Sequence, residues 1–253
     1  MRSQQAAEVE RFAYFQQQVL SNSEFWRRFG RRPEFAGKAV LDLGCGHGAM
    51  SLEAARDGGH VLGIDLNEEL VAFADRNLHR SAPDLADRVR FEVVNLDDLD
   101  QDGHFDIVIS KDTFEHVEDM RTMTATLYRV LKPGGELWAG FSPLYWSPWG
   151  DHGRTGLRIP WGHALLPRSL VLRAATRHVN HPVRSLNDIG MNGMTPRQFR
   201  EYVRLAGFEI ASLQYNRGDK RLMATLSRVR RIAWLERWAT VGIYAILRRP
   251  AES

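Results

Sequence analysis

The sequence predicts an α/β protein built on a mostly parallel β-sheet with helices on both faces. Between residues 38 and 141, short and almost continuously apolar segments alternate with amphipathic ones, and glycine or proline clusters separate them. Strands that are apolar on both faces are typical of parallel sheets covered by two helical layers. Such sheets bind ligands at the carboxyl ends of their strands, so a site is expected in the turns there.

The elements follow in order along the chain. Residues 4–20 carry apolar side chains at helical spacing and predict an amphipathic helix. Thr195 and Gln198 predict a capping box where regular structure resumes after an insertion. Further helices are expected over 49–56, after the N-cap residue Asn67, over 120–131, and over a basic stretch, 219–238. The expected strands are 39–44, 60–66, 89–96, 105–110, 136–141, 208–215 and 241–249.

These elements divide the chain into four parts. The insertion is too long for a plain connection, and its aromatic content argues against disorder, so a lid over the site is expected. The parts are an N-terminal helical arm (1–36), a cofactor-binding core (37–141), a lid rich in aromatic residues and histidine (142–194), and a C-terminal continuation of the core (195–253).

Composition excludes several classes of protein. The single cysteine, Cys45, cannot form an internal disulfide, which is typical of the reducing cytoplasm, and a cytoplasmic location is expected. The balance of 34 basic against 31 acidic residues gives a net charge of +3, which argues against DNA as a partner and disfavours RNA. The longest apolar stretch, 238–247, is about half of the ~20 residues that a membrane helix requires, so no membrane span is expected.

The segment VLDLGCGHG at residues 40–48 is the main functional motif. Gly44, Gly46 and Gly48 let the backbone turn tightly and approach a ligand, and the helix that follows offers unpaired N–H groups. Asp42 lies within the preceding apolar strand, where a carboxylate is costly without a cationic or hydrogen-bond-donating partner. The motif therefore predicts a bound ligand at the end of the first strand.

Two nucleotide ligands remain open on this motif alone. A dinucleotide fold requires G-x-G-x-x-G/A, which Gly44, Gly46 and Ala49 satisfy. S-adenosylmethionine has an α-amino group and no pyrophosphate, and Asp42 favours it because a carboxylate would repel a pyrophosphate. Asp65, 21 residues after Gly44, is the expected acceptor of ribose hydroxyls in either case.

Five segments together resemble the class I S-adenosylmethionine-dependent methyltransferases, particularly the small-molecule branch related to ubiquinone- and menaquinone-type enzymes. The resemblance covers residues 38–141 closely and 195–248 loosely. It implies a Rossmann-like sheet of seven strands, mostly parallel with one antiparallel edge strand, and a methyl-transferring enzyme that uses S-adenosyl-L-methionine. The segments are VLDLGCGHG (40–48), GIDLN (63–67), FDIVISKDTFEHVEDM (105–120), YRVLKPGG (128–135) and AGFEI (206–210).

The resemblance also implies the cofactor-binding residues. Asp42 is expected at the amino group of the cofactor, Asp65 at the ribose hydroxyls, and the first two glycines of the motif at the methionine portion. Asn95 replaces the acid that usually faces the adenine, and Asp97 and Asp98 are the alternatives. The full expected set is Asp42, Gly44, Cys45, Gly46, Asp65, Leu66, Asn95, Leu96 and Ser110.

Three histidines are candidate catalytic residues. His116 follows the fourth strand, and an ordinary pKa of about 6.5 suits it as a general base toward an acceptor hydroxyl; a packing role is the alternative. His152 and His163 are candidates to face the acceptor from the lid. Asp112, Glu115, Asp151 and these histidines match no dedicated ligand spacing, so no metal is expected.

The lid indicates the class of acceptor. Four aromatic residues within it are candidates to wall an acceptor pocket: Tyr145, Trp146, Trp149 and Trp161. The expected reaction is therefore O-methylation of a small, largely apolar or aromatic metabolite in bacterial natural-product biosynthesis. C- or N-methylation of a small molecule, RNA methylation through the basic stretch 217–231, and cofactor binding without catalysis are the alternatives. An exposed arm or lid also allows a homodimer.

Overall fold

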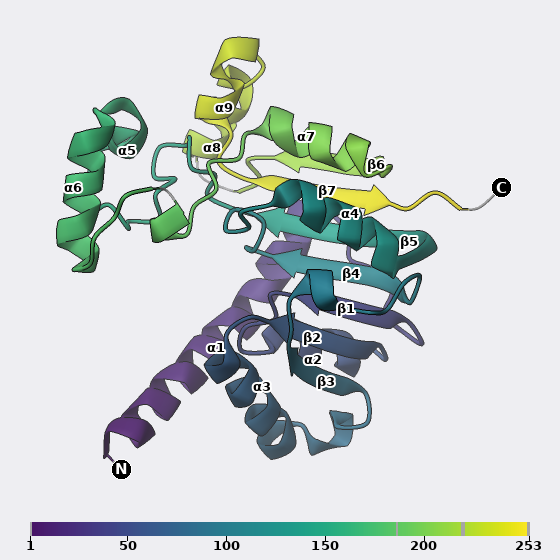
Figure 1. Cartoon of the computed structure of the whole chain (residues 1–253). Helices are drawn as coiled ribbons and strands as arrows, with labels where there is room; N and C mark the ends of the chain where they lie inside the picture. Colours follow the sequence, from purple (N-terminus) through teal and green to yellow (C-terminus); the bar gives the residue numbers. More distant parts are fainter. Residues whose placement is uncertain (1, 186, 219–220, 252–253) are drawn as a thin grey trace.

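Seven strands form a single mixed sheet in the computed structural model, which describes residues 2–185, 187–218 and 221–251 (Figure 1). The strand order is β3-β2-β1-β4-β5-β7-β6. β7 is antiparallel to both of its neighbours and lies one position inside the edge, while the other strand pairs are parallel. The predicted fold class is confirmed. The strands are β1 (Ala39–Leu43), β2 (His60–Asp65), β3 (Val89–Val93), β4 (Phe105–Lys111), β5 (Leu131–Phe141), β6 (Glu209–Tyr215) and β7 (Ile243–Arg248).

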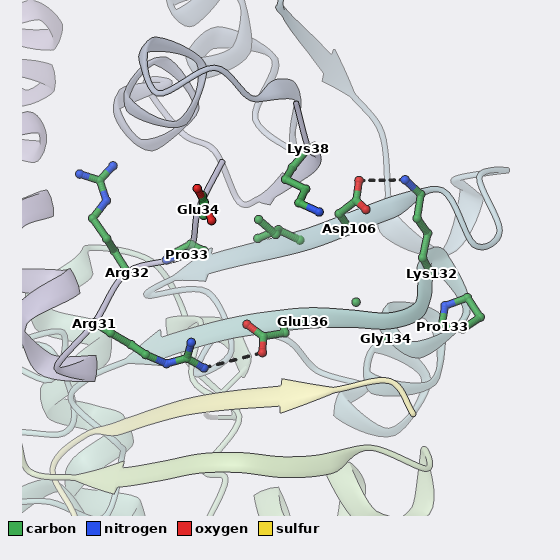
Figure 2. Close-up of a pocket in the computed structure, with 12 residues that line it drawn as sticks. Arg31, Arg32, Pro33, Glu34, Lys38, Asp106, Lys132, Pro133, Gly134 and Glu136 are labelled. Carbon is green, nitrogen blue, oxygen red and sulfur yellow. Dashed lines mark hydrogen bonds and ion pairs between the residues drawn. The ribbon is translucent and has the colours of Figure 1, made fainter. Parts of the chain in front are cut away.

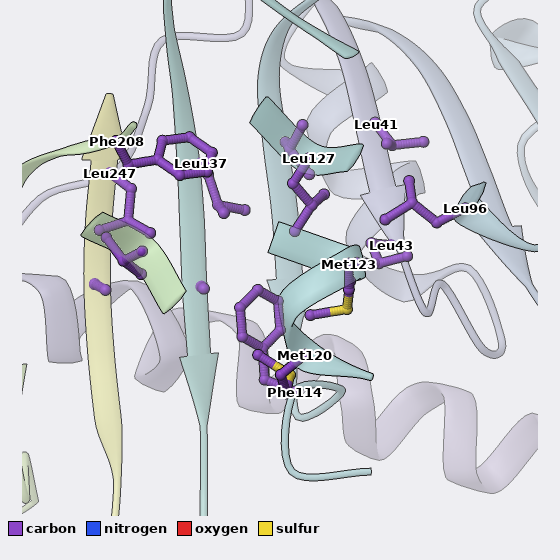
Figure 3. Close-up of a cluster of buried hydrophobic side chains, with 14 of the residues drawn as sticks. Leu41, Leu43, Leu96, Phe114, Met120, Met123, Leu127, Leu137, Phe208 and Leu247 are labelled. Atoms are coloured by element: carbon purple, nitrogen blue, oxygen red, sulfur yellow. The ribbon is translucent and has the colours of Figure 1, made fainter. Parts of the chain in front are cut away.

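Two hydrophobic cores cover the two faces of the sheet. On one face pack the helices α1 (Arg2–Phe29), α2 (Ala49–Arg56) and α3 (Glu68–Ser81). On the other pack α4 (Met120–Val130) and α7 (Pro196–Leu205). Figure 3 shows the second core, where Met123 and Leu127 of α4 lie against Leu41 and Leu43 of β1. Successive residues of a strand point to opposite faces, so Val40 belongs to the first core and Leu41 to the second.

Successive strands are added to the sheet in two directions, first on one side of β1 and then on the other. β1 pairs with β2 on one side and with β4 on the other, so consecutive crossovers run outward from this pair of strands. A crevice forms at the carboxyl ends of the strands where the direction of winding reverses. This switch point positions the turn after β1 and the turn after β4 opposite each other.

Local sequence fixes two of the helix starts as predicted. The side-chain oxygen of Asn67 accepts hydrogen bonds from the backbone N–H groups of Glu69 and Leu70, at 3.0 and 3.2 Å. Thr195 and Gln198 form the expected reciprocal capping box at the start of α7. Both capped helices follow directly on segments that line the carboxyl edge of the sheet.

Several boundaries differ from the predicted ones. α1 extends to Phe29 because its last turns carry aromatic side chains into the core. β3 ends at Val93, since Asn95 adopts an extended conformation and caps the short helix η2 (Leu96–Asp98). The basic helix predicted over 219–238 is interrupted: it consists of α8 (Arg221–Val229), η4 (Ala233–Leu235) and α9 (Glu236–Ala239). Asp219 and Lys220 of that prediction lie outside the described residues.

The segment 142–194 has a small hydrophobic core of its own. α5 (Gly162–Leu165) and α6 (Arg168–Val179) stand away from the sheet (Figure 1). Trp146 Nε1 donates to the carbonyl of Gly193 within the segment, and Trp161 Nε1 anchors the segment by donating to the carbonyl of Trp238. The short helices η1 (Pro83–Leu85) and η3 (Asn187–Ile189) complete the secondary structure. The hydrophobic core of segment 142–194 consists of Tyr145, Ala175, Val183, Ile189 and Met191. Over the residues that the structure describes, no helix is both long and apolar enough to cross a membrane.

Candidate functional site

A cavity of about 650 Å³ opens at the switch point, between the carboxyl ends of β1, β2 and β4. The expected residues Gly44, Asp65 and His116 line it together, which brings the ends of three strands to one place. Sequence reasoning missed two groups of lining residues: apolar ones at the ends of strands and on α4 (Leu43, Ile64, Val94 and Met123), and residues of the segment that follows β4 (Thr113, Val117, Glu118 and Asp119). The lining is Leu43, Gly44, Ile64, Asp65, Leu66, Val94, Asn95, Leu96, Asp97, Asp112, Thr113, His116, Val117, Glu118, Asp119 and Met123.

The glycine turn after β1 closes one side of this cavity. The N–H groups of Gly44 and Cys45 both donate to the carbonyl of Ile64 in β2, at 2.9 and 3.0 Å. Gly44 has φ +73°, and a Cβ there would overlap the Thr113 side chain. A positive φ and a close neighbour each require glycine at this position. The turn thus brings bare backbone next to the cavity, as the motif predicts.

Asp65 ends β2 and joins the glycine turn. Its carboxylate accepts from the N–H of Gly46 at 3.0 Å and from the N–H of Asn67 at 2.9 Å. Asn95 and Leu96 lie further along the same cavity, beside Leu66. A carboxylate, an amide and apolar side chains in one cavity suit a nucleoside, with its ribose hydroxyls, a heteroaromatic base and its apolar faces. The chemistry of these lining residues fits S-adenosylmethionine.

Asp42 is buried beneath the turn and does not line the cavity. Its carboxylate accepts from Ser51 Oγ of α2 at 2.5 Å. Burial raises the pKa of Asp42 to about 6, partly offset by the hydrogen bond from Ser51 and by the charge of Lys111. The geometry therefore ties β1 to α2 through Asp42, and a direct contact with the cofactor stays a prediction.

Cys45 and Ser110 are also buried outside the lining of the cavity. Burial and the charge of Asp42 raise the pKa of the Cys45 thiol, so the thiolate is disfavoured. Ser110 Oγ has no hydrogen-bond partner among the described residues. The structure gives both a packing position beneath the turns, and their contact with cofactor remains a prediction.

His116 and His152 lie side by side, with ring centroids 5.4 Å apart. His116 Nδ1 lies 2.5 Å from the carbonyl oxygen of Gly190, and His152 Nε2 lies 3.0 Å from that of Pro143. A carbonyl only accepts, so these two nitrogens carry the protons of the neutral rings. His116 Nε2 is then the nitrogen with a free lone pair. Burial lowers the pKa of both imidazoles.

Glu115, the residue before His116 in the chain, is a buried carboxylic acid. Neither oxygen of Glu115 has a hydrogen-bond partner within the described part of the chain. Burial, together with the charge of Asp112, raises the pKa of Glu115 well above its ordinary range. The described residues contain no group of three or more histidine, cysteine or acidic side chains suited to a metal ion.

The lid places its other candidates away from the cavity. His163 is buried, and its Nε2 lies 2.5 Å from the carbonyl oxygen of Tyr145, whose hydroxyl donates back to the carbonyl of His163. Tyr145, Trp146 and Trp161 pack within the lid or against Trp238, and Trp149 is 49% exposed. None of these residues lines the cavity, and their contact with the acceptor stays a prediction.

A second cavity, of about 540 Å³, lies at the other end of the strands, where they begin (Figure 2). Its charged groups are largely paired: Lys132 with Asp106 at 2.8 Å, and Arg31 with Glu136 at 3.7 Å. The glycine turn and His116 do not contribute to it. The cavity at the carboxyl ends is therefore the candidate active site.

Comparisons with known proteins agree with this site. Residues 40–135 match the family model of a methyltransferase domain. The chain is 38% identical over 115 residues to the ubiquinone biosynthesis O-methyltransferase of Thiobacillus denitrificans, covering 45% of this chain and 47% of that protein. It is 41% identical over 108 residues to the enzyme of the same name from Xanthomonas oryzae pv. oryzae, covering 42% and 44%. The matched stretch thus spans about half the length of these curated relatives.

Solved structures support the same fold. The chain superposes on an S-adenosylmethionine-dependent methyltransferase from Mesorhizobium loti with a TM-score of 0.58 and 22% identity, covering 86% of this chain and 94% of that one. At this identity the likeness concerns the fold alone. The glycine turn and Asp65 lie within the matched segment 40–135. Five strands of the seven-stranded sheet begin in it or next to it. The chain therefore carries, at residues 40–135, a segment that matches a methyltransferase domain, within a fold shared with S-adenosylmethionine-dependent methyltransferases.

Proposed function

We propose that this chain transfers the methyl group of S-adenosylmethionine to a hydroxyl of a small, largely apolar or aromatic metabolite in bacterial secondary metabolism. The observation that carries the proposal is the meeting of the glycine turn, Asp65 and His116 around one cavity. The names of the curated relatives, which are O-methyltransferases of ubiquinone biosynthesis, favour oxygen as the acceptor atom.

The cofactor, when bound, supplies an electrophilic methyl group on a sulfonium sulfur. Gly44 and Gly46 would face its methionine portion and Asp65 its ribose hydroxyls. Asn95 and Leu96 would hold the adenine. Charge is neutralised rather than created at the sulfur, so the contribution of the protein is chiefly to position the reacting groups. His116 and the lid would orient the acceptor and exclude water.

His116 is the proposed general base. Its Nδ1–H is committed to the carbonyl of Gly190, which leaves Nε2 to accept a proton from the acceptor hydroxyl. A lowered pKa keeps the imidazole neutral near pH 7, so the accepting form predominates. His152 lies beside it but does not line the cavity, so it would contact the acceptor from the side rather than take the proton.

Calorimetry with S-adenosylhomocysteine tests the cofactor site. Binding to the wild-type chain is expected, with affinity lost in Gly44→Val and in Asp65→Ala. His60→Gln, at the amino end of β2, is the control and should bind as the wild type does. Unchanged affinity in both site variants would reject the proposed cofactor site. Incubation of cell extracts with a labelled methyl donor, followed by mass spectrometry, then identifies whether oxygen, nitrogen or carbon is methylated.

A further inference from the structure

A basic groove adjoins the candidate active site on the far side of Asp112. Two neighbouring cavities, of about 410 and 350 Å³, share Arg28, Asn216, Arg217 and Gly218 as lining residues and form this groove. It runs between the last turns of α1, the turn after β6 and the start of β7. The proposed methyl transfer leaves this groove without a role.

The groove is rich in arginine. Arg27, Arg28 and Arg217 line it, against Glu24 as the acidic residue among the described lining. Glu24 is already paired, because Arg28 Nη2 donates to it at 2.6 Å. No hydrogen bond or ion pair joins Arg217 to another described residue. Arg28 Nε is buried and likewise has no hydrogen-bond partner in the described chain. Arg217 therefore offers the groove a guanidinium that forms no hydrogen bond or ion pair with a described residue.

The backbone that carries Arg217 is held firmly. Asn216, the residue before it, is buried and has φ +50°. Its side-chain amide donates to the carbonyl of Ala239 at 2.7 Å and accepts from the N–H of Val241 at 2.6 Å. These bonds fix the end of β6 to the start of β7. Arg217 thus projects from a position fixed by the sheet.

The groove and the active-site cavity meet at one pair of residues. Ser142 lines the groove, and its N–H donates to Asp112 Oδ1 at 3.2 Å. Asp112 lines the active-site cavity. Tyr244, on the groove side, accepts from Arg28 Nη1 at 2.7 Å and donates toward Ser142 Oγ at 3.4 Å. The two hollows are therefore neighbours, joined through the hydrogen bond between Ser142 and Asp112.

We infer that the acceptor carries an anionic group, a carboxylate or a phosphate, and that Arg217 and Arg28 bind it in this groove while the methylated atom lies in the adjoining cavity. The inference rests on the proposed function and narrows its acceptor to an apolar body with one acidic end. A guanidinium presents a planar fork of donors that matches the oxygens of either group. The neighbouring Tyr244 hydroxyl adds a further polar contact at the same end of the groove.

Calorimetry of the full chain, loaded with S-adenosylhomocysteine, tests this with three matched probes: 4-hydroxybenzoate, 4-hydroxyphenyl phosphate and the neutral 4-hydroxybenzamide. At least one anion should bind about tenfold more tightly than the amide, as a charge-assisted hydrogen bond would give. The tighter of the two identifies the anion as carboxylate or phosphate. Arg217→Gln should reduce the preference severalfold, with Arg28 retaining the remainder. Arg204→Gln, an exposed arginine on α7 outside the groove, is the control and should retain it.

Two results would overturn the inference: anions that bind no better than the amide, or a preference that is undiminished in Arg217→Gln. Arg217 is exposed, so its replacement should leave the fold and the affinity for S-adenosylhomocysteine unchanged. Failure of S-adenosylhomocysteine to bind would instead reject the proposed function, and the same probes titrated into the ligand-free chain would still test the groove. The two failures are thereby distinguished.

Discussion

Gly44 meets two constraints that can be separated by experiment. It has a positive φ, and a Cβ would overlap Thr113, whereas Gly103 has a similar φ of +57° with open space around it. Gly103→Ala should cost about 1 kcal/mol of unfolding free energy, from backbone strain alone. Gly44→Ala should cost roughly 2–3 kcal/mol and also weaken binding of S-adenosylhomocysteine. Urea unfolding and calorimetry measure these effects, and equal costs for the two variants would contradict the argument.

Asp42 is a buried acid whose charge opposes folding. Its folded-state pKa of about 6 exceeds the ordinary 3.8, so the folded chain holds this proton more tightly than the unfolded chain. The unfolding free energy therefore falls as pH rises from about 4 to about 6, and the penalty is fully present above that range. Asp42→Asn should stabilise the ligand-free chain at pH 8 by about 1–3 kcal/mol.

The same prediction has a pH signature. The gain from Asp42→Asn should shrink as the pH falls from 8 to 5, because the wild-type carboxyl becomes protonated. Urea unfolding at the two pH values measures it. Asp87→Asn removes an exposed carboxylate and is the control, for which no such gain is expected. A gain that is independent of pH would show that burial of the charge is not its source.

His116 predicts the acid limb of the pH–rate profile. Burial lowers its pKa below 6.5, so the base form persists and activity should hold until the pH falls below that value. His116→Gln should reduce kcat by about 10²–10⁴ and remove this limb, with little change in affinity for S-adenosylhomocysteine. His60→Gln should behave as the wild type. A normal rate in His116→Gln would leave the imidazole with a packing role.

For single residues, sequence patterns predict positions that local backbone geometry sets. They predict less well the positions that depend on contacts with residues far away in the chain. Gly44 follows from a contiguous motif and Asp65 from its position at the end of the next strand, and both line the cavity. The role of His163 does not, because its partner, Tyr145, lies 18 residues away within the lid. The burial of Asp42 against Ser51 likewise depends on how α2 packs on β1.

Among the elements, α1 depends on its last turns. Phe29 is buried, and its ring lies 5.4 Å from that of Trp138 and 5.7 Å from that of Tyr244, centroid to centroid. Phe29→Ala should cost about 3–5 kcal/mol of unfolding free energy through the cavity it leaves. Val9, near the other end of the helix, is 66% exposed, so Val9→Ala should change stability by less than about 0.5 kcal/mol. Urea unfolding compares the two, and similar losses would contradict a helix anchored at one end.

Element boundaries were predictable where a cap or a turn is written in the sequence. Asn67 and Thr195 begin their helices as expected. The basic helix is interrupted for a tertiary reason: Arg230 stacks 3.6 Å from the ring centroid of Tyr215 and pairs with Glu236 at 3.3 Å. Helical spacing alone does not encode such contacts.

On the scale of the whole molecule, the lid and the sheet have separate cores. Met191 belongs to the lid core and Met123 to the core between the sheet and α4, and both are buried. Met191→Ala should speed amide hydrogen exchange over 142–194 while β1 to β5 keep their protection. Met123→Ala, the matched control, should lower the free energy of global unfolding by about 2–5 kcal/mol. Exchange mass spectrometry distinguishes them, and uniform acceleration in Met191→Ala would indicate a single cooperative unit.

The number of strands was predictable from the resemblance, whereas alternation alone specifies a parallel sheet and not which strands are neighbours. The arrangement of the lid was not. Its contacts join Trp146 to Gly193 and Trp161 to Trp238, across long stretches of chain. Aromatic content therefore predicted an ordered segment correctly, while its packing partners required the structure.

A lid that packs on its own side chains gives the chain room to diverge. Substitutions among the few residues of that cluster can change the shape of segment 142–194 without repacking the sheet and its helices, where the methyl donor would be bound. Gene duplication followed by drift in 142–194 would then yield enzymes that share one methyl source and differ in what they modify.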